Sequence, residues 1–315
     1  MSEAWLITGG SGFVGKALLS RLAASAQRPS TLRVLARQPI DAPACFESCV
    51  GDLLDPHSLE RACEGIDTVI HLAGIAHVGS AASAEARAVN LDGSLALLRA
   101  AIDAGARRFV FLSSTLSLDD SLHYGRDKRR VEEALIAAAA AGSIEVVVLR
   151  AVNIYGVGMR GNIATMIRLI SSGALPRLPT LSNRLSLVGV DDVVNALILA
   201  ATHVSSNDSS AKLAIRVTLT DGCEYRINAI EEAIYTAIER RPSHWRLPAV
   251  ILFAASGLAE LLEKLRIFRS GIGLRTYRNL TRDNLFDNQS ARAELGFEPT
   301  TNFFAQLDTL VRRSD

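Results

Sequence analysis

The chain has 315 residues, of which 49% are hydrophobic and 21% are charged, and its formal net charge is +1. This length and composition describe an ordinary globular protein with one large domain or two modest domains. The near-neutral charge excludes the basic excess that is typical of nucleic-acid-binding domains, so we expect no nucleic-acid partner.

The cysteines indicate neither a disulfide framework nor a metal site. No secretory leader precedes Trp5, and we therefore expect reduced thiols in a cytoplasmic protein. Two cysteines lie close together in the sequence, but no second pair of ligands accompanies them, so we expect no bound metal. The four cysteines are Cys45, Cys49, Cys63 and Cys223.

The N-terminal stretch from Trp5 to Leu18 has the pattern of a strand, a glycine-rich turn and a helix. Glycines let the backbone approach a pyrophosphate, and the following helix points its free N–H groups and positive dipole end at that anion. The stretch therefore predicts a dinucleotide-binding unit rather than a plain structural turn. The residues expected at the cofactor are Gly9, Gly12, Phe13, Val14 and Gly15.

Residues 31–36 read as a second strand, and the residue after it suggests the identity of the cofactor. An NAD-binding unit of this kind has an acidic residue about twenty positions after the glycines, where it holds the ribose 2′-hydroxyl. Here the nearest charge is Arg37, with Arg33 close by. We expect Arg37 to bind a 2′-phosphate, which favours NADP(H) over NAD(H); the alternative is a solvated arginine at the end of a strand.

Strands and helices then alternate as far as residue 150. We expect strands at 50–55, 67–72, 108–112 and 145–150, and helices that begin at Pro56, run through 88–101 and begin near Tyr124. His71 reads as a packed strand residue rather than a catalyst. The alternation predicts an α/β fold, a Rossmann-type doubly wound and mostly parallel sheet.

The regular alternation ends after Arg150, which predicts a second, smaller domain. We assign 1–150 to a dinucleotide-binding domain to which 188–218 returns. Residues 151–187 and 219–315 are assigned to a substrate-binding domain, with helices expected near 163–171, 228–240, 248–266 and 302–312. The uncharged run from Leu247 to Ala259 is too short to span a bilayer, and we expect it to pack on this smaller domain rather than contact a membrane.

A Y-x-x-x-K motif, Tyr124 to Lys128, places a phenol and an ammonium one helical turn apart on the same face. A nearby ammonium favours the phenolate and lowers a pKa that is about 10 in isolation. The tyrosine can then exchange a proton with a carbonyl or hydroxyl oxygen near neutral pH. An exposed helical turn is the alternative, but Ser113, Ser114 and Thr115 lie just upstream in a dinucleotide fold, so we predict a catalytic pair.

Together these motifs resemble the extended short-chain dehydrogenase/reductases, the NAD-dependent epimerase/dehydratase family, which act largely on nucleotide sugars. The glycine motif T-G-x-x-G-x-x-G of that family corresponds to Thr8, Gly9, Gly12 and Gly15. The resemblance covers essentially the whole chain. Its other motifs are Asp52-Leu53, His71 to Gly74, Asn90, the Tyr124/Lys128 pair, Arg150 to Gly156 and Arg184 to Asp192.

The resemblance implies a role for each matching residue. Tyr124 is expected to donate a proton with Lys128 as its partner, and both are also expected at the cofactor. Thr115 is expected to hydrogen-bond the substrate oxygen. Asp52, Leu53 and Ala73 are expected to contact the cofactor, with the first two beside its adenine. Asn153 and Arg184 are expected at the sugar nucleotide, where a guanidinium suits the diphosphate; the alternative for Arg184 is a surface arginine before a strand. The family also implies a homodimer through the helices around 90–101 and 124–140.

Finer features are similar to those of UDP-4-keto-6-deoxy-hexosamine 4-reductases of O-antigen synthesis and their C4-epimerase relatives. These features are Ala76-His77-Val78, Gly161-Asn162, Leu178-Pro179 and the stretch from Asn183 to Asp191, and they place Asn162 at the substrate. One departure concerns the nine positions from Thr115 to Tyr124, where the family usually has a longer segment. The residues between them can extend over ~26 Å, so the site can still close, with a trimmed wall around the substrate.

The sequence thus predicts an NADPH-linked reductase that delivers hydride to C4 of a 4-keto nucleotide sugar. A C4-epimerase that retains its cofactor is an alternative that the motifs do not separate from a reductase. A non-catalytic sensor of cofactor redox state is a further alternative, which the presence of both Tyr124 and Lys128 disfavours.

Overall fold

The computed structural model describes residues 3–40, 43–75, 83–119, 122–203, 214–264 and 281–312. The chain divides into two compact units. The first contains Met1–Val152, Val190–Leu219 and Asn288–Glu298, and the second contains Asn153–Gly189, Thr220–Asp287 and Pro299–Asp315. Each unit has a hydrophobic core of its own.

The first unit is built on a seven-stranded sheet in the order β3-β2-β1-β4-β5-β6-β9, in which every neighbouring pair is parallel. Chain order reverses between β1 and β4, and ligands of such sheets bind beyond the carboxyl ends of the strands at this switch point. The predicted Rossmann-type sheet is therefore confirmed. Its strands are β1 Ala4–Thr8, β2 Thr31–Ala36, β3 Glu47–Val50, β4 Thr68–His71, β5 Arg108–Ser114, β6 Glu145–Ala151 and β9 Ala214–Leu219.

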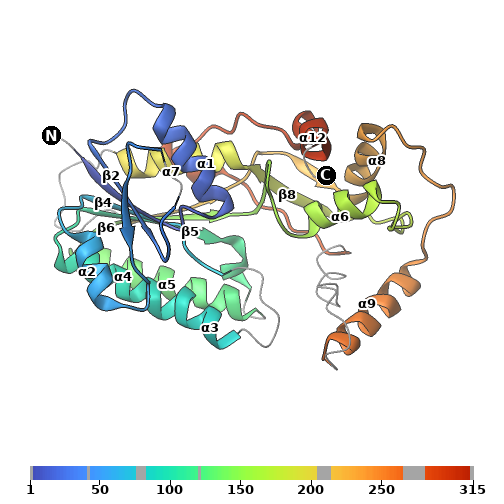
Figure 1. Ribbon diagram of the computed structural model, residues 1–315. Coiled ribbons are helices and arrows are strands. Elements are labelled where there is room, and N and C mark those ends of the chain that lie inside the picture. Colours follow the sequence, from blue (N-terminus) through green and yellow to red (C-terminus); the bar gives the residue numbers. More distant parts are fainter. Residues whose placement is uncertain are drawn as a thin grey trace. The chain divides into compact units, whose positions relative to one another are not determined.

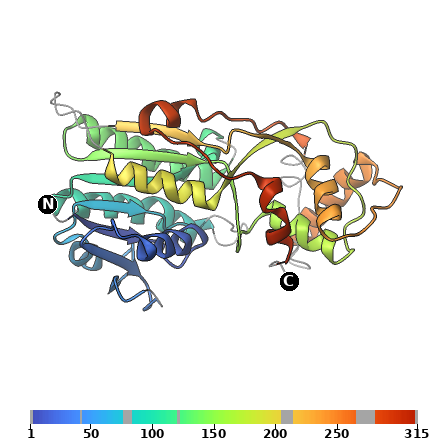
Figure 2. The same cartoon turned by 90° about the horizontal axis from the view of Figure 1, so that it is seen from above.

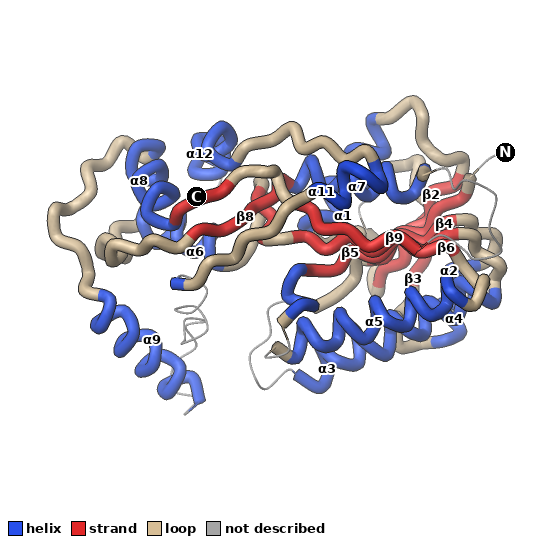
Figure 3. Tube along the Cα trace, turned by 180° about the vertical axis from the view of Figure 1, so that it is seen from behind, coloured by secondary structure: helices blue, strands red, loops and turns tan. Residues whose placement is uncertain are grey.

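Helices cover both faces of this sheet (Figures 1 and 3). One face carries α1 (Phe13–Ala24) and α7 (Val190–Thr202), and the other carries α2 (Pro56–Cys63), α3 (Ser83–Arg87), α4 (Ser94–Asp103) and α5 (His123–Ala140). Because both faces are buried, the central strands are apolar without alternation, as in the fully buried run from Val146 to Leu149.

The strand expected at 50–55 lies earlier in the chain, because β3 ends at Val50. The residues after it form a turn, in which the Asp52 carboxylate accepts a 2.9 Å hydrogen bond from the backbone N–H of Leu54. Asp55 then caps α2 through the N–H of His57, and Pro56 occupies the first turn, as the sequence predicts.

The helix expected through 88–101 is not uniform. Residues Ala88–Gly93 form a π-helical turn before α4 begins at Ser94. Within this turn Asn90 is buried, and its side-chain amide accepts from the N–H of Ile75 at 2.7 Å and donates to its carbonyl at 3.0 Å. The π turn thus holds the segment that follows β4, at the switch point, and such turns are frequent at functional sites.

The described part of the second unit contains a three-stranded sheet in the order β10-β8-β7, together with helices (Figure 2). Its core lies around the buried rings of Tyr155, Tyr225 and Phe303. The strands are β7 Asn153–Tyr155, β8 Arg184–Gly189 and β10 Glu224–Arg226, and the helices are α6 Asn162–Ser171, α8 Ile227–Ala237, α9 Ala249–Lys264 and α12 Phe303–Arg312.

The segment 288–298 belongs to the first unit, although the sequence analysis placed it in the second. It contains α11 (Gln289–Leu295), which packs against β9 and α7 (Figure 3). The buried side chains of Ala291, Leu295 and Phe297 explain the difference, because they cover the edge of the sheet near β9. The polar residues around them concealed this short helix in the sequence.

Candidate active site

The turn after β1 requires glycine for steric reasons. Gly9 has φ of +77°, and a Cβ there would lie 2.6 Å from the backbone nitrogen of Ala73. A Cβ on Gly15 would collide with the carbonyl oxygen of Gly9, which also accepts a 3.0 Å hydrogen bond from the N–H of Gly12. Gly12 caps α1 without any side-chain hydrogen bond. The N–H groups at the start of this helix are therefore open to an anion.

A chain of buried hydrogen bonds joins this turn to β4 and the π turn. His71 binds the Thr8 hydroxyl through Nδ1 at 2.6 Å and the Ser94 hydroxyl through Nε2 at 2.8 Å. The Ser94 hydroxyl donates its hydrogen to the carbonyl of Asn90, so it accepts a hydrogen bond from Nε2–H of His71. The Nδ1 of His71 is then unprotonated and accepts from the Thr8 hydroxyl. Burial and the nearby Lys128 ammonium lower the pKa of His71 to about 3. His71 is thus a neutral structural residue.

Arg33 in β2 and Arg37 just after it differ in what they contact. Arg37 is exposed just after the strand and forms no hydrogen bond or ion pair with the described residues. Arg33 is engaged elsewhere. Its Nη1 donates to the carbonyls of Ala62 at 3.0 Å and Glu64 at 2.8 Å, at the end of α2, and its Nε pairs with Glu47. Arg33 is thus less available than Arg37 for a phosphate.

The remaining residues expected at the cofactor lie after the ends of β3 and β4. Asp52 is half-buried in the turn after β3, and Leu53 is buried beneath Gly93, where a Cβ would lie 2.8 Å from the Leu53 Cβ. Ala73 follows β4, and its N–H lies 3.4 Å from the Thr8 hydroxyl. Together with the glycine turn, these residues follow the carboxyl ends of β1, β3 and β4, and β1 and β4 are the strands of the switch point.

Thr115 is buried at the start of a 3₁₀ turn, Thr115–Leu118, directly after β5. This turn packs closely on α5, because Gly125 has no side chain where a Cβ would collide with the Leu116 carbonyl oxygen. Arg129, one helical turn after Gly125, donates a 2.5 Å hydrogen bond from its Nε to the carbonyl of Ser117 in the 3₁₀ turn. The start of the shortened connection between Thr115 and Tyr124 therefore contacts α5 at Gly125 and at Arg129.

Tyr124 and Lys128 share one face of α5, and the Lys128 Nζ lies 5.9 Å from the centre of the Tyr124 ring. The same Nζ donates a 2.9 Å hydrogen bond to the Leu112 carbonyl and lies 4.3 Å from the centre of the Phe111 ring. A Cβ on Gly74 would be 3.7 Å from it. Lys128 is thus held between the ends of β4 and β5.

The structure does not show the expected depression of the phenol pKa. Burial raises the pKa of Tyr124 to about 12. Burial also lowers the pKa of Lys128 to about 8, although the Glu132 carboxylate opposes this shift. Desolvation outweighs the attraction between the two groups, because each would carry its charge away from water.

Glu132 is a residue of this region that the sequence analysis missed. It is fully buried one helical turn after Lys128, and its carboxylate accepts from the Ser113 hydroxyl at 2.5 Å. Arg150, at the end of β6, donates to both carboxylate oxygens. The signal was present in the sequence, because Glu132 occupies the same helical face as Tyr124 and Lys128, beside the apolar Val131.

The residues expected at the substrate lie in the second unit. Asn153 is exposed at the start of β7, and Asn162 is exposed at the start of α6. Arg184, at the start of β8, pairs with Glu224 at 2.8 Å and with Asp283 at 3.8 Å. Two carboxylates thus engage the guanidinium that was expected at a diphosphate.

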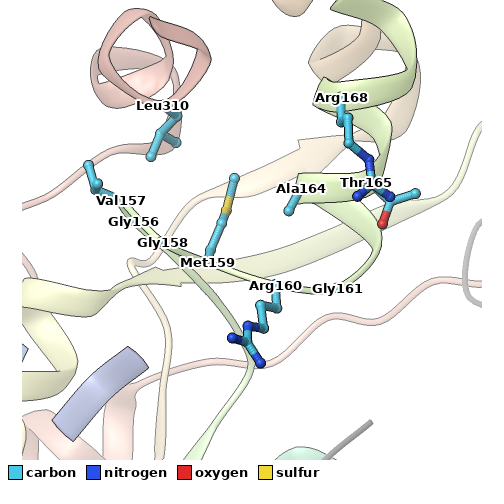
Figure 4. Close-up of a pocket in the computed structure, with 10 residues that line it drawn as sticks. All are labelled: Gly156, Val157, Gly158, Met159, Arg160, Gly161, Ala164, Thr165, Arg168 and Leu310. Atoms are coloured by element: carbon cyan, nitrogen blue, oxygen red, sulfur yellow. The ribbon is translucent and has the colours of Figure 1, made fainter. Parts of the chain in front are cut away.

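A pocket of ≈ 430 Å³ lies in the second unit, beside the start of α6 (Figure 4). The glycine-rich segment from Gly156 to Gly161 forms much of its lining, and Arg168 runs beside Thr165 on α6. Arg160 and Met159 point in opposite directions from this segment. Arg160 and Arg168 both line the pocket and are exposed, and Figure 4 shows their guanidinium groups apart from each other, with that of Arg168 beside Thr165.

Two further expectations concern metals and membranes. No group of three or more potential metal ligands occurs in the described part of the chain. No helix there is long and apolar enough to cross a membrane. Ala76-His77-Val78, one of the finer features of the sequence, lies outside the described residues.

Comparisons with known proteins identify the family. A family model described as "NAD dependent epimerase/dehydratase family" matches residues 5–215. The chain is 30% identical to UDP-glucose 4-epimerase of Vibrio cholerae over 273 residues, which are 80% of each chain. It is 28% identical to 3 beta-hydroxysteroid dehydrogenase/Delta 5→4-isomerase of Mycobacterium tuberculosis, with 93% of this chain and 85% of the relative covered.

A solved structure of UDP-glucose 4-epimerase from Thermotoga maritima has the same fold, with a TM-score of 0.73, 20% identity and 98% of both chains covered. The family model covers more than half of the present chain, including the glycine turn, Thr115, Tyr124 and Lys128. The chain therefore belongs to the NAD dependent epimerase/dehydratase family and is an NAD(P)-dependent enzyme of the extended short-chain dehydrogenase/reductase type.

Proposed function

We propose that the protein reduces a 4-keto nucleotide sugar at C4 with NADPH, using Thr115, Tyr124 and Lys128. One observation carries this proposal: the 3₁₀ turn that begins with the buried Thr115 packs on α5, whose Lys128 binds the Leu112 carbonyl at the end of β5, next to the strands of the switch point. The relationship to a UDP-glucose 4-epimerase supports a nucleotide sugar as the substrate class.

The first unit fits a dinucleotide cofactor. A Cβ at Gly9 or Gly15 would collide with the backbone and displace the glycine turn, and the start of α1 has no side-chain cap. Gly9, Gly12, Phe13, Val14 and Gly15 would hold the pyrophosphate, and the turns after β3 and β4 would line the adenosine and nicotinamide portions. The bound nicotinamide supplies the hydride.

Arg37 supports NADPH rather than NADH as the electron donor. It is exposed at the end of β2, has no partner among the described residues, and stands where an NAD-binding unit has an acid. A guanidinium at this point favours a 2′-phosphate, and binding the phosphate would break no ion pair of Arg37 with the described residues. NADPH supplied from solution suits a net reduction, whereas an epimerase regenerates a cofactor that it retains.

The protein's own groups can manage the charge that develops on the substrate oxygen. Thr115 would donate a hydrogen bond to that oxygen, and Tyr124 would transfer its proton to it as negative charge appears. A phenol with a raised pKa of about 12 is protonated at neutral pH, which suits an acid in the reductive direction. The Lys128 ammonium would then stabilise the resulting phenolate.

The substrate's diphosphate is proposed to lie near the start of α6 rather than at Arg184. Two carboxylates already engage Arg184, so a diphosphate there would have to replace both and would meet their negative charge. Arg160 and Arg168 line the pocket beside Asn162 and are exposed. Guanidinium groups of this kind bind phosphate oxygens in pairs of hydrogen bonds.

A second candidate function is oxidoreduction of a lipid alcohol or ketone. The steroid dehydrogenase relative covers 93% of this chain, and α9 exposes large apolar side chains, with Val250 77% and Leu258 57% exposed. The Thr115–Tyr124 connection is also short, which leaves more room for a bulky substrate. The observations on the β5–α5 site hold equally for this candidate.

A substrate panel tests the proposal. UDP- and dTDP-linked 4-keto sugars are offered with NADPH or NADH, and 4-hydroxy sugars and a 3-hydroxysteroid are offered with NADP⁺ or NAD⁺, while nicotinamide absorbance and product are followed together. We expect stoichiometric oxidation of NADPH with a 4-keto sugar. Sugar conversion without net NADPH oxidation would identify an epimerase instead, and turnover of the steroid alone would favour the second candidate.

A further inference from the structure

The carboxylate of Asp221 is a buried charged group that the proposed reaction does not use. Asp221 lies in the second unit, two residues after β9, and is 7% exposed. Its Oδ2 accepts a 2.6 Å hydrogen bond from the phenol of Tyr225 and a 3.2 Å hydrogen bond from the phenol of Tyr155. Its Oδ1 accepts from the N–H of Cys223 at 3.0 Å. A single carboxylate oxygen therefore joins two buried tyrosines, one at the end of β7 and one in β10.

Tyr155 holds the start of the glycine-rich segment 156–161, which lines the pocket of the second unit (Figure 4). The three glycines of this segment have φ of +148°, +86° and +102° in chain order. Glycine has more backbone freedom than any other residue and no side chain that could pack, so the position of the segment depends on its two ends. The Tyr155 phenol holds the first end through Asp221, and its oxygen also lies 3.1 Å from the hydroxyl of Thr301, just before α12.

Tyr225 holds the start of α12, a second element at this pocket. The N–H of Phe303, the first residue of α12, donates a 3.1 Å hydrogen bond to the Tyr225 oxygen. Leu310, about two turns later in the same helix, lines the pocket (Figure 4). Burial, and then the hydrogen bond to Asp221, raise the pKa of Tyr225 well above its usual value, so the phenol keeps its hydrogen and remains a donor to the carboxylate. Asp221 thus holds both the glycine-rich segment and α12.

The proposed function assigns the diphosphate of the substrate to this pocket, and the inference drawn from Asp221 rests on that assignment. A site that is already held in its bound geometry binds more tightly, because less ordering remains when the ligand arrives. We propose that Asp221 is a positioning residue of the pocket: it fixes the glycine-rich segment relative to α12 and thereby sets the affinity for a nucleoside diphosphate. Three donors already bind its carboxylate, so it acts through the two tyrosines rather than by contact with the ligand.

Calorimetric titration of the full-length protein with UDP and dTDP tests this role without any turnover. Asp221→Asn keeps the size of the side chain but replaces the charged acceptor of two phenols with a neutral amide, which accepts weaker hydrogen bonds. We expect the Kd for the nucleoside diphosphate and the KM for the nucleotide sugar to rise about tenfold, with kcat and the affinity for NADPH nearly unchanged. The matched control is Asp308→Asn, which makes the same exchange at an exposed position of α12 and should bind like the wild type.

Substitution of Tyr155 separates positioning from a general loss of stability. Tyr155→Phe keeps the buried ring and removes only the phenol oxygen, so it carries the test if Asp221→Asn does not fold. We expect it to raise the Kd about threefold or more. The variant Tyr155→Phe/Asp221→Asn should lose no more affinity than Asp221→Asn alone, because both changes break the same link. A purely structural role would lower the midpoint of thermal unfolding in these variants and leave the Kd unchanged.

Normal binding of UDP and dTDP by both Asp221→Asn and Tyr155→Phe would overturn the positioning role, as would a wild type that binds neither nucleotide. Failure of the proposed function gives a different result. Affinities that change as predicted, without oxidation of NADPH by a 4-keto sugar, contradict the proposed reaction and leave the role of Asp221 intact. Reduction of a 4-keto sugar by variants that bind the nucleoside diphosphate normally contradicts the role of Asp221 alone.

Discussion

The guanidinium of Arg150 donates hydrogen bonds to the buried carboxylate of Glu132, with Nε 3.1 Å from one carboxylate oxygen and 3.0 Å from the other. This pair joins the end of β6 to α5, and the Ser113 hydroxyl joins it from the end of β5. Because Lys128 lies one turn earlier on the same helix, the pair fixes the part of α5 that carries the proposed catalytic residues.

Replacing Glu132 should therefore be costly to stability. Glu132→Gln leaves the charge of Arg150 without a carboxylate in a largely buried position, and breaking a buried pair in this way typically costs about 3–5 kcal/mol. Urea unfolding followed by circular dichroism measures this loss. Glu133→Gln, at the exposed neighbouring position, is the control and should change stability by less than about 0.5 kcal/mol. Equal effects of the two changes would show that the buried pair has no special role.

The glycine turn yields a prediction that separates binding from stability. Gly15→Ala should weaken binding of the dinucleotide by about tenfold or more, because its Cβ collides with the Gly9 carbonyl and deforms the cradle. Gly105→Ala is the control. Its Cβ meets open space, but φ of +77° costs about 1 kcal/mol, so it should lower stability without changing affinity. Calorimetric titration with NADPH and NADH measures affinity, and unchanged affinity in Gly15→Ala would contradict the assigned cradle.

Cofactor preference should depend on Arg37. Arg37→Asp replaces a candidate partner of the 2′-phosphate with an acid suited to the ribose hydroxyls, so the ratio of kcat/KM for NADPH to that for NADH should fall about tenfold or more. Arg28→Asp makes the same change of charge at an exposed position before β2 and controls for net charge. A ratio that moves equally in both variants would remove Arg37 from the cofactor site.

Lys128 should produce a dependence of stability on pH. Its pKa is lowered from 10.5 in the unfolded chain to about 8 by burial. Between these values the unfolded chain binds more protons than the folded protein, so stability gains up to about 1 kcal/mol per pH unit as pH rises through this window. Lys128→Met should lack this gain. Parallel stability profiles of the two proteins between pH 8 and pH 10 would show that Lys128 keeps its usual pKa.

The same titration should appear in catalysis with the opposite consequence. If the ammonium stabilises the phenolate of Tyr124, the rate of reduction should fall as pH rises through about 8, even while the enzyme gains stability. Glu132 raises the pKa of Lys128, so Glu132→Gln should move this fall in rate to lower pH. A rate profile that stays flat across this range would exclude the charged lysine from the reaction.

The sequence predicted the parts of the molecule that local patterns determine. The turn from Thr8 to Gly15 could be identified because only glycine tolerates its backbone geometry, and the parallel sheet followed from apolar strands that alternate with helices. The placement of Tyr124 and Lys128 on one helical face also followed from spacing alone.

Properties that depend on distant neighbours could not be predicted in this way. Spacing places Glu132 on the helical face of Tyr124 and Lys128, but only the folded chain shows that Arg150 and Ser113 bind its carboxylate. The direction of the Tyr124 pKa shift depends on how much water burial removes, which no spacing reveals. The exposure of Val250 and the engagement of Arg184 by two carboxylates likewise required the folded chain.

The central claim is that the protein is a reductase whose proton donor is Tyr124, and one measurement addresses it directly. The oxidation of NADPH by a 4-keto nucleotide sugar is followed by absorbance for the wild type and for Tyr124→Phe, with the affinity of each for NADPH measured in parallel. We predict one NADPH oxidised per sugar reduced by the wild type, and loss of turnover with nearly unchanged affinity in Tyr124→Phe. Undiminished turnover in Tyr124→Phe, or sugar conversion by the wild type without net oxidation of NADPH, would contradict the claim.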